Sequence, residues 1–405
     1  MVSLAKATIA ILAVIVALRW IDGAGHRDDD LGQLPAVALA SDEVAPVICR
    51  PHCRQLLTLD VAKLDALCDR LRIQRLFSDR GTKPSASALL HGLRLHGNDE
   101  VTTSELSEPV PILQVFLDSE VSGYVLGGSI FQLGPDGPRY RWRTSVYPRK
   151  TGVAERHYAQ IIASLGEFGV PLSAPLMING HRYRLLDIVR DFAVRFDSER
   201  HELEWAAVAL ALYLAPAPEW RDRFGVATTF DDVAAHLLAT ELTERSCAGT
   251  HVFYALTILA RVDEKRTIFT PRVRNMLLAR LTSLVDTMRQ TQRADGSWSV
   301  LWFDTDAAKR APGDGSLIVT GHLVESLLYL PARFKVPDDE VLRAGEWLWQ
   351  ALSQVPEDAY VNDLCPMTHA LCALRHLLRR PNMQNAGTVD PGLPSTPDLQ
   401  ILQKR

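Results

Sequence analysis

Two segments of the sequence repeat one pattern, in which a histidine follows a cysteine by four positions and a threonine directly precedes the histidine. Cys247 precedes His251 in this way, and Cys365 precedes His369. Positions i and i+4 lie on the same face of a helix, so each cysteine would project beside its histidine. Thiolate and imidazole groups are ligands that zinc prefers. The pattern therefore indicates candidate metal ligands.

A third segment adds His322, which lies close after Thr320 and precedes another apolar run. If the three apolar helices run parallel, their starts gather at one mouth of the fold. Four such side chains would close a tetrahedron around zinc, whereas three would leave a position open for catalysis. We expect the mouth to be lined by five residues, Cys247, His251, His322, Cys365 and His369.

Two other interpretations of these residues stay open on the sequence alone. The histidines could bond to backbone groups of a polar mouth without metal, and Cys247 could form a disulfide with Cys365 across that mouth. Cys372 and His376 continue the stripe of Cys365 and His369 along one helix face. The stripe would extend ~16 Å, which is too long for one metal ion, so core packing accounts for part of the pattern.

The elements that must position these residues are helices. Buried and amphipathic segments alternate: 205–214 and 252–260 are apolar nearly all round, whereas 272–289 carries a charged face. Connections are short and contain proline or glycine, as helix pairs require. This alternation predicts a mainly α fold of helical hairpins in an inner and an outer layer, an α/α toroid over 151–380. The predicted helices are 155–168, 183–197, 201–215, 230–241, 247–262, 271–292, 316–330, 338–353 and 365–379.

Residues 56–150 form a predicted helical segment with a small β insertion. Helical spacing of apolar residues covers 56–76 and 85–95. Residues 112–117 and 124–133 have the composition of strands, and a Gly-Pro-Asp-Gly turn follows at 134–137. The tail 381–405 is rich in proline and glycine, so we expect it to be disordered.

The first residues predict an anchor. Residues 7–18 are uncharged and lie between Lys6 and Arg19, within a mostly apolar segment 1–22. A cleaved signal peptide and a buried helix are the alternatives to a membrane anchor. Lys6 favours the short end inside and the body on the extracytoplasmic side. The linker 23–55 follows; its Cys49 and Cys53 indicate a local disulfide or an untied loop rather than a metal site.

Gln292, Gly296 and Trp298 have the Q-x3-G-x-W spacing of squalene–hopene cyclases. The chain therefore resembles the terpenoid cyclase and protein prenyltransferase toroid superfamily, and most closely uncharacterised exported bacterial proteins with such repeats. The resemblance covers roughly residues 155–379, with one full motif. It implies an α/α toroid in which this motif joins an outer helix to the next inner one.

The resemblance also implies candidate chemistry. Protein prenyltransferases use aspartate, cysteine and histidine at the toroid mouth, and Asp363 with Cys365 provides a D-x-C, but here His369 lies on the same helix as the cysteine. Class II cyclases use a D-x-D-D acid. This chain has Asp304 and Asp306 followed by an alanine, so an exposed loop is the preferred interpretation. Asp314 is a helix N-cap candidate that could also face the mouth.

Composition limits the classes of function. The 405 residues are 47% hydrophobic and 23% charged, which is typical of a globular protein, and the net charge of -4 argues against nucleic acid as a partner. We expect a membrane-anchored or exported toroid whose central cavity binds a peptide, glycan or lipid, or another small molecule. The alternative is a zinc-dependent enzyme at the mouth, like a prenyltransferase or cyclase; a terpene cyclase is the weaker alternative.

Overall fold

A computed structural model describes the body of the chain. The described residues are 46–52, 54, 56–73, 83–141, 157, 159–197, 203–215, 217, 219–243, 246–310, 315–356 and 364–378, and all belong to one unit, Val37–Arg405. The predicted anchor over 1–22, most of the linker over 23–55 and the tail over 381–405 lie outside this set. Within it, no helix is both long enough and apolar enough to cross a bilayer.

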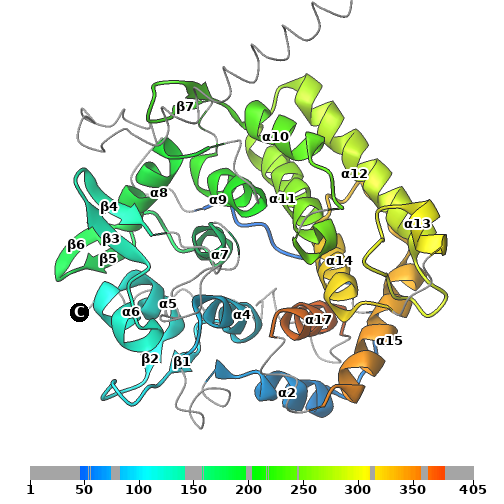
Figure 1. Cartoon of the computed structure of the whole chain (residues 1–405). Coiled ribbons are helices and arrows are strands. Elements are labelled where there is room, and N and C mark those ends of the chain that lie inside the picture. The colour runs from blue at the N-terminus through cyan, green and yellow to red at the C-terminus, as the bar shows by residue number, and fades with distance from the viewer. Residues whose placement is uncertain are drawn as a thin grey trace, which may run out of the picture. The chain divides into compact units, whose positions relative to one another are not determined.

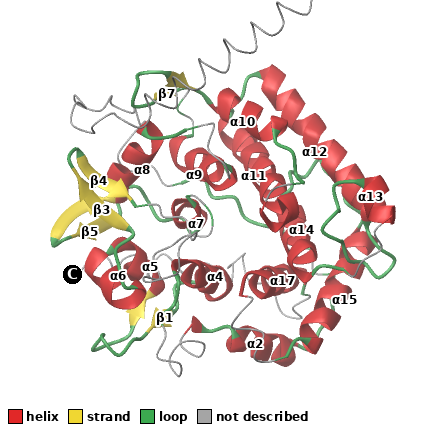
Figure 2. Ribbon diagram, in the orientation of Figure 1, coloured by secondary structure: helices red, strands yellow, loops and turns green. Residues whose placement is uncertain are grey.

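The fold is mainly helical, as predicted (Figure 2). Each helix expected after residue 155 is present, with ends that differ by a few residues. The helices are α2 (Val61–Arg70), α4 (Ala86–His96), α5 (Ile112–Leu117), α6 (Ser119–Leu126), α7 (Gln160–Glu167), α8 (Leu185–Val194), α9 (Glu204–Leu214), α10 (Phe230–Ala239), α11 (Thr250–Arg266), α12 (Pro271–Thr291), α13 (Thr305–Arg310), α14 (Leu317–Tyr329), α15 (Asp338–Gln354) and α17 (Leu364–Leu377).

Strands in the described residues occur as short antiparallel pairs. They are β1 (Glu100–Val101) with β2 (Val110–Pro111), β3 (Phe131–Gly134) with β4 (Gly137–Tyr140), β5 (Pro175–Ile178) with β6 (His181–Arg184), and β7 (Trp220–Arg221) with β8 (Ala227–Thr228). The turn predicted at 134–137 is confirmed, since Gly134 pairs with Gly137. The expected β insertion thus exists, but it is smaller than predicted.

The strand predicted over 112–117 is wrong, because these residues form α5. The strand predicted over 124–133 is wrong in its first part, which is the end of α6. A short apolar run has the same appearance in a buried strand and in a buried helix, so periodicity cannot separate them. Asp118 decides the local outcome: its carboxylate accepts hydrogen bonds from the backbone of Glu120 and Val121 and caps α6.

Six helices, which we call the inner helices, are in contact in a closed succession. They are α4, α7, α9, α11, α14 and α17; each contacts the next, and α17 contacts α4 (Figure 1). Every residue of α9 is buried, which is the burial that its all-round apolar sequence predicts. Amphipathic helices pack against them from outside: α12 on α11, α15 on α14 and α17, α10 on α9, and α2 on α17.

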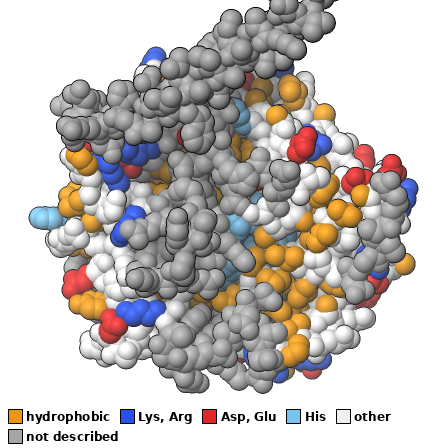
Figure 3. Space-filling view, viewed as in Figure 1, with side chains coloured by type: hydrophobic (Ala, Val, Ile, Leu, Met, Phe, Trp, Pro, Cys, Tyr) orange, Lys and Arg blue, Asp and Glu red, His pale blue; other side chains and the backbone are white. Residues whose placement is uncertain are grey.

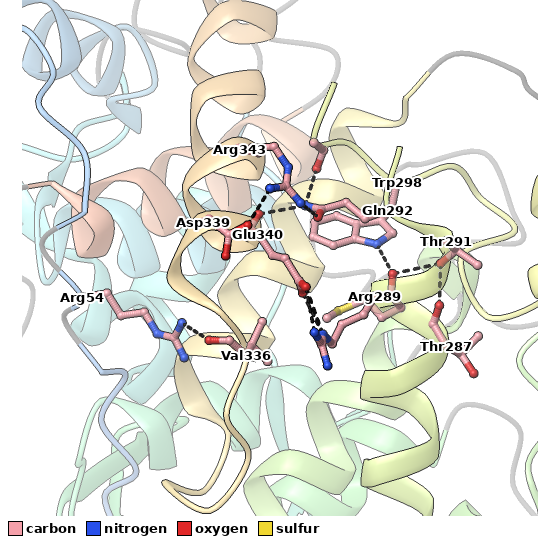
Figure 4. Close-up of polar contacts among 12 residues, drawn as sticks. Arg54, Thr287, Arg289, Thr291, Gln292, Trp298, Val336, Asp339, Glu340 and Arg343 are labelled. Carbon is pink, nitrogen blue, oxygen red and sulfur yellow. Dashed lines mark hydrogen bonds and ion pairs between the residues drawn. The ribbon is translucent and has the colours of Figure 1, made fainter. Parts of the chain in front are cut away.

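The Q-x3-G-x-W segment forms the corner between α12, α14 and α15 (Figure 4). The Gln292 amide donates to the carbonyl oxygens of Gly296 (3.0 Å) and Glu340 (2.8 Å). The Trp298 indole donates to the Met288 carbonyl oxygen at 2.7 Å. Gly296 has φ +93°, and a Cβ there would lie 2.4 Å from the Arg343 carbonyl oxygen, so only glycine fits. The motif therefore ties an outer helix to its neighbours.

The N-terminal segment 46–57 crosses the ends of three inner helices. Its backbone N–H groups at Val47, His52 and Leu57 donate to the carbonyl oxygens of Leu212, Leu328 and Leu377, at 2.8, 2.7 and 2.9 Å. These carbonyls lie near the C-terminal ends of α9, α14 and α17, where intrahelical partners run out. Because one segment reaches all three ends, these helices run in the same direction, and their starts gather on the opposite side.

Gly321 provides a test of this packing. A Cβ at Gly321 in α14 would lie 2.9 Å from the backbone nitrogen of Ala370 in α17. Gly321→Ala should therefore force the two helices apart and destabilise the protein by about 1–3 kcal/mol, measured as a lower urea midpoint.

The matched control is Gly123→Ala in α6, where nothing lies within 4 Å of the added atom. Alanine there should be neutral or stabilise by about 0.5–1 kcal/mol. Equal midpoints for the two variants would contradict the close contact between α14 and α17.

Candidate metal centre

The structure brings the five predicted residues together at the starts of three inner helices. His251 lies in the first turn of α11, His322 in the second turn of α14, and Cys365 and His369 in the first two turns of α17. The Nε2 atoms of His251 and His322 are 3.3 Å apart, and Cys365 Sγ lies 3.9 Å from His322 Nε2. Histidine side chains are visible near the middle of one face of the molecule (Figure 3).

Cys247, His322 and Cys365 lie close enough to share one metal ion, and His251 adjoins Cys247 and His322. The ligand atoms of Cys247, His322 and Cys365 all lie within 4.8 Å of one another, and the Cys247 sulfur hydrogen-bonds with Cys365 and His251. Zn–N bonds of ~2.1 Å and Zn–S bonds of ~2.3 Å imply N···N separations of ~3.4 Å and N···S separations of ~3.6 Å across a tetrahedron. The observed 3.3 and 3.9 Å are close to these values.

Backbone contacts orient the rings for metal binding. His322 Nδ1 donates to the Ile318 carbonyl oxygen at 2.6 Å, and His91 Nδ1 donates to the Ser87 carbonyl oxygen at 2.6 Å. A carbonyl oxygen can only accept, so Nδ1 carries the proton and the neutral ring presents a lone pair at Nε2. Metal-binding histidines have this same oxygen partner on the second nitrogen.

Sequence reasoning missed two histidines of the cluster. The ligand atoms of His157, Cys247 and His251 lie within 4.8 Å of one another, as do those of His91, Cys365 and His369. The rings of His157 and His251 are 4.6 Å apart. His91 belongs to α4 and lacks the cysteine partner that marks the other segments. Its one signal is its place within the apolar run 88–93.

Strained backbone presents Cys247. Cys247, Ala248 and Gly249 have φ of 51°, 55° and 73°, so three successive residues are left-handed before α11 begins. Each non-glycine residue in this region costs roughly 1–2 kcal/mol. The Trp302 indole donates to the Ala248 carbonyl oxygen at 2.7 Å, and the Thr250 hydroxyl donates to that of Cys247 at 2.8 Å. Such strain persists where surroundings enforce it, typically at functional sites.

The cluster favours the protonation states that a metal needs. A hydrogen bond from Cys365 holds the pKa of the Cys247 thiol well below its usual range, although burial opposes the shift. Burial lowers the pKa of His251 to about 4 and that of His91 to about 4. The lowered thiol pKa favours a thiolate, and both rings are neutral at neutral pH; these are the forms that coordinate zinc.

A buried polar network continues from the cluster between the inner helices. Glu325 pairs with His369 Nδ1 and lies 3.4 Å from Arg94, whose other amino group is 2.6 Å from Glu167. The Tyr254 hydroxyl also donates to Glu167, at 2.7 Å. Burial acts to raise the pKa of Glu325, but His369 and Arg94 outweigh it and hold that pKa well below its usual range.

A small cavity lies between this network and the N-terminal segment. Its volume is about 80 Å³, and its lining includes Cys49, Arg94, Glu325 and Tyr329. Pockets for drug-sized ligands have volumes of ~300–1,000 Å³, so this one suits a few water molecules rather than a peptide or glycan. The expected central cavity stays a prediction.

The aspartate candidates behave differently from the cysteines and histidines. Asp304 and Asp306 are exposed, and Asp304 accepts hydrogen bonds from the backbone of Asp306 and Ala307, both at 2.9 Å. Asp304 thus caps α13, which packs on the outer helix α12. Both aspartates are exposed as predicted, but Asp306 lies in the short helix α13 rather than in a loop, and neither carboxylate joins the cluster. Asp314 lies outside the described residues.

The cysteines of the described residues form no disulfide. They are Cys49, Cys68, Cys247, Cys365 and Cys372. The disulfide predicted as one alternative between Cys247 and Cys365 is therefore not formed, and the two sulfurs hydrogen-bond instead. Cys53, the other half of the possible local disulfide, lies outside the described set.

Comparison with protein-family models, curated proteins and solved structures found no match for this chain. The resemblance to the cyclase and prenyltransferase superfamily thus stays a prediction from the motif residues.

The buried ion pairs of Arg94 allow a stability test. Arg94→Met leaves Glu167 and Glu325 buried without their cation, which should cost about 3–5 kcal/mol of unfolding free energy. Arg333→Met is the control, because its pair with Glu264 is exposed, at 53% and 36%. That change should cost about 0–1 kcal/mol in the same urea titration. Equal losses would show that the buried network contributes no more than a surface pair.

Acid should destabilise the protein through the buried histidines. The pKa values of His91 and His251 are about 4 in the folded protein and 6.5 when unperturbed, so the unfolded chain binds more protons between these values. With a chelator present, unfolding free energy should fall as pH drops from about 6.5 to about 4. His91→Asn should flatten this slope, whereas His181→Asn, at an exposed position, should not. A wild-type slope near zero would argue against buried neutral imidazoles.

Proposed function

We propose that the chain is an α/α toroid. The closed succession of contacts among the inner helices supports this architecture, together with the amphipathic helices packed outside them. The corner formed by Gln292, Gly296 and Trp298 adds support, because it ties an outer helix to the following inner and outer helices, as the superfamily resemblance implies.

We propose that the function of this toroid depends on a zinc ion at its mouth, bound by Cys247, His251, His322 and Cys365. One observation carries the proposal: the Nε2 atoms of His251 and His322 face each other at 3.3 Å. His322 presents a lone pair there, because its proton is on Nδ1. Cys247, His322 and Cys365 offer three ligand atoms within 4.8 Å of one another, and His251 Nε2 would complete the tetrahedral set that zinc prefers.

The zinc ion would connect three helices that are far apart in the sequence. His251 and Cys247 belong to the start of α11, His322 to α14 and Cys365 to α17. A metal ion held by all three fixes the mouth and its neighbouring polar network in one arrangement. The alternative function, binding of a peptide, glycan or lipid in a central cavity, has less support, because the cavity beside the network measures about 80 Å³.

The location of the protein rests on its first residues. The apolar segment 1–22 supports a membrane anchor with the body on the extracytoplasmic side, and this stays a prediction. The same placement would set a zinc-dependent activity outside the cytoplasm.

Metal analysis of the purified full chain tests the zinc site. We expect at least one tightly bound zinc ion per chain and a lower melting temperature after chelation, because metal binding contributes to folding. Cys247→Ser and His322→Asn should each lose this zinc.

Cys68→Ser is the matched control, because Cys68 is buried in α2, outside the cluster. It should keep the full zinc content. Wild-type protein without zinc, after purification in buffer free of chelators, would contradict the proposed function.

A further inference from the structure

A second group of ligand atoms lies beside the proposed zinc site. The ligand atoms of His91, Cys365 and His369 lie within 4.8 Å of one another, and all three residues are buried, with 4%, 6% and 2% of their surfaces exposed. The group shares Cys365 with the first site and otherwise draws on different residues. Its histidines come from α4 and α17, two inner helices that pack against each other.

Both histidines of this group are oriented by oxygen atoms. His91 Nδ1 donates to the Ser87 carbonyl oxygen, and His369 Nδ1 pairs with the Glu325 carboxylate. Each ring therefore presents Nε2 as its remaining ligand atom. A carboxylate on the far nitrogen also makes a histidine a stronger metal ligand, and this arrangement recurs around zinc in proteins.

The charges of the buried groups around the cluster are compatible with two zinc ions. Glu167 and Glu325 provide two carboxylates, Arg94 is the buried cation between them, and zinc binding would ionise the Cys247 and Cys365 thiols. These groups sum to a charge of about -3 when both thiols are ionised, so two zinc ions leave a net charge of about +1. A single zinc ion would leave the buried cluster negative.

We infer that His91, Cys365 and His369 bind a second zinc ion, and that the Cys365 thiolate bridges the two ions. This inference rests on the proposed function, because the first ion supplies the other side of the bridge. A thiolate sulfur has several lone pairs, so it can bind two metals at once. The second ion has three protein ligands, which leaves its fourth position for water or for a small anion.

The open position gives the second ion a distinct chemical role. Zinc with three protein ligands lowers the pKa of its bound water to ~7, so hydroxide forms at neutral pH. The first ion, with four protein ligands, has no such position. The second site is therefore where a zinc-dependent reaction that uses activated water would take place.

Zinc stoichiometry of the full-length chain tests the inference. Wild-type protein, loaded with zinc and freed of excess metal, should hold two ions per chain. His91→Asn and His369→Asn should each reduce this to one, and His251→Asn should also reduce it to one by removing the other ion. His96→Asn in α4 and His376→Asn in α17 are matched controls on the same helices and should retain two.

The outcomes separate the two proposals. One zinc ion that His251→Asn removes and His91→Asn retains would overturn the second site and leave the proposed function intact. One ion that His91→Asn removes and His251→Asn retains would overturn both the four-ligand site and the bridge. No bound zinc in the wild type would overturn both proposals.

If the histidine variants fail to fold, a cobalt titration of the wild-type protein tests the inference instead. Titration of wild-type protein with Co²⁺ should show thiolate-to-metal absorption that grows until two equivalents are bound. Two cobalt ions that share a thiolate couple magnetically, so the electron paramagnetic resonance signal of the first equivalent should weaken as the second binds. Saturation at one equivalent, or two independent signals, would overturn the bridged pair.

Discussion

The structure depends on burying ionisable groups inside an apolar layer of helices. Imidazoles, thiols, an arginine and two carboxylates lie among the inner helices, where an unpaired polar group costs several kcal/mol. Each charged group in this set has a partner: Arg94 has two carboxylates, and Glu325 has both Arg94 and His369. The Nε2 atoms of His251 and His322 face each other at 3.3 Å. Two lone pairs at this distance would repel, so a proton or a metal ion must lie between the two nitrogens.

Backbone geometry at the two ends of the inner helices supports this arrangement. At one end, N–H groups from the described part of segment 46–57 donate to carbonyl oxygens of α9, α14 and α17, and a cavity of about 80 Å³ lies beside them. At the other end, the left-handed turn at Cys247 and Ala248 precedes α11, held by Trp302. The N-terminal segment thus covers the C-terminal ends of α9, α14 and α17. The candidate ligands lie on the opposite side, at the helix starts that form the mouth.

The Q-x3-G-x-W segment has a positioning role: its side chains make structural hydrogen bonds and supply no candidate ligand. Gln292 and Trp298 hold the outer helices α12 and α15 against the start of α14. The Trp298 backbone N–H also donates to the hydroxyl oxygen of Thr320, which lies two residues before His322. The motif therefore fixes the helix that carries a candidate ligand, and the exposed aspartates that follow it cap α13 instead of supplying an acid.

The sequence by itself determined the helices and five of the seven thiol and imidazole residues of the cluster. Apolar periodicity reports local burial, and the cysteine and histidine at i and i+4 share a helix face whatever the rest of the chain does. Tertiary structure decided the rest, because segments 112–117 and 124–133 have no local signal that separates buried helix from strand. His91 and His157 joined the cluster through packing between helices distant in sequence. No periodicity within one segment can encode the distance between two segments, so the convergence of α4, α11, α14 and α17 appears only in the folded chain.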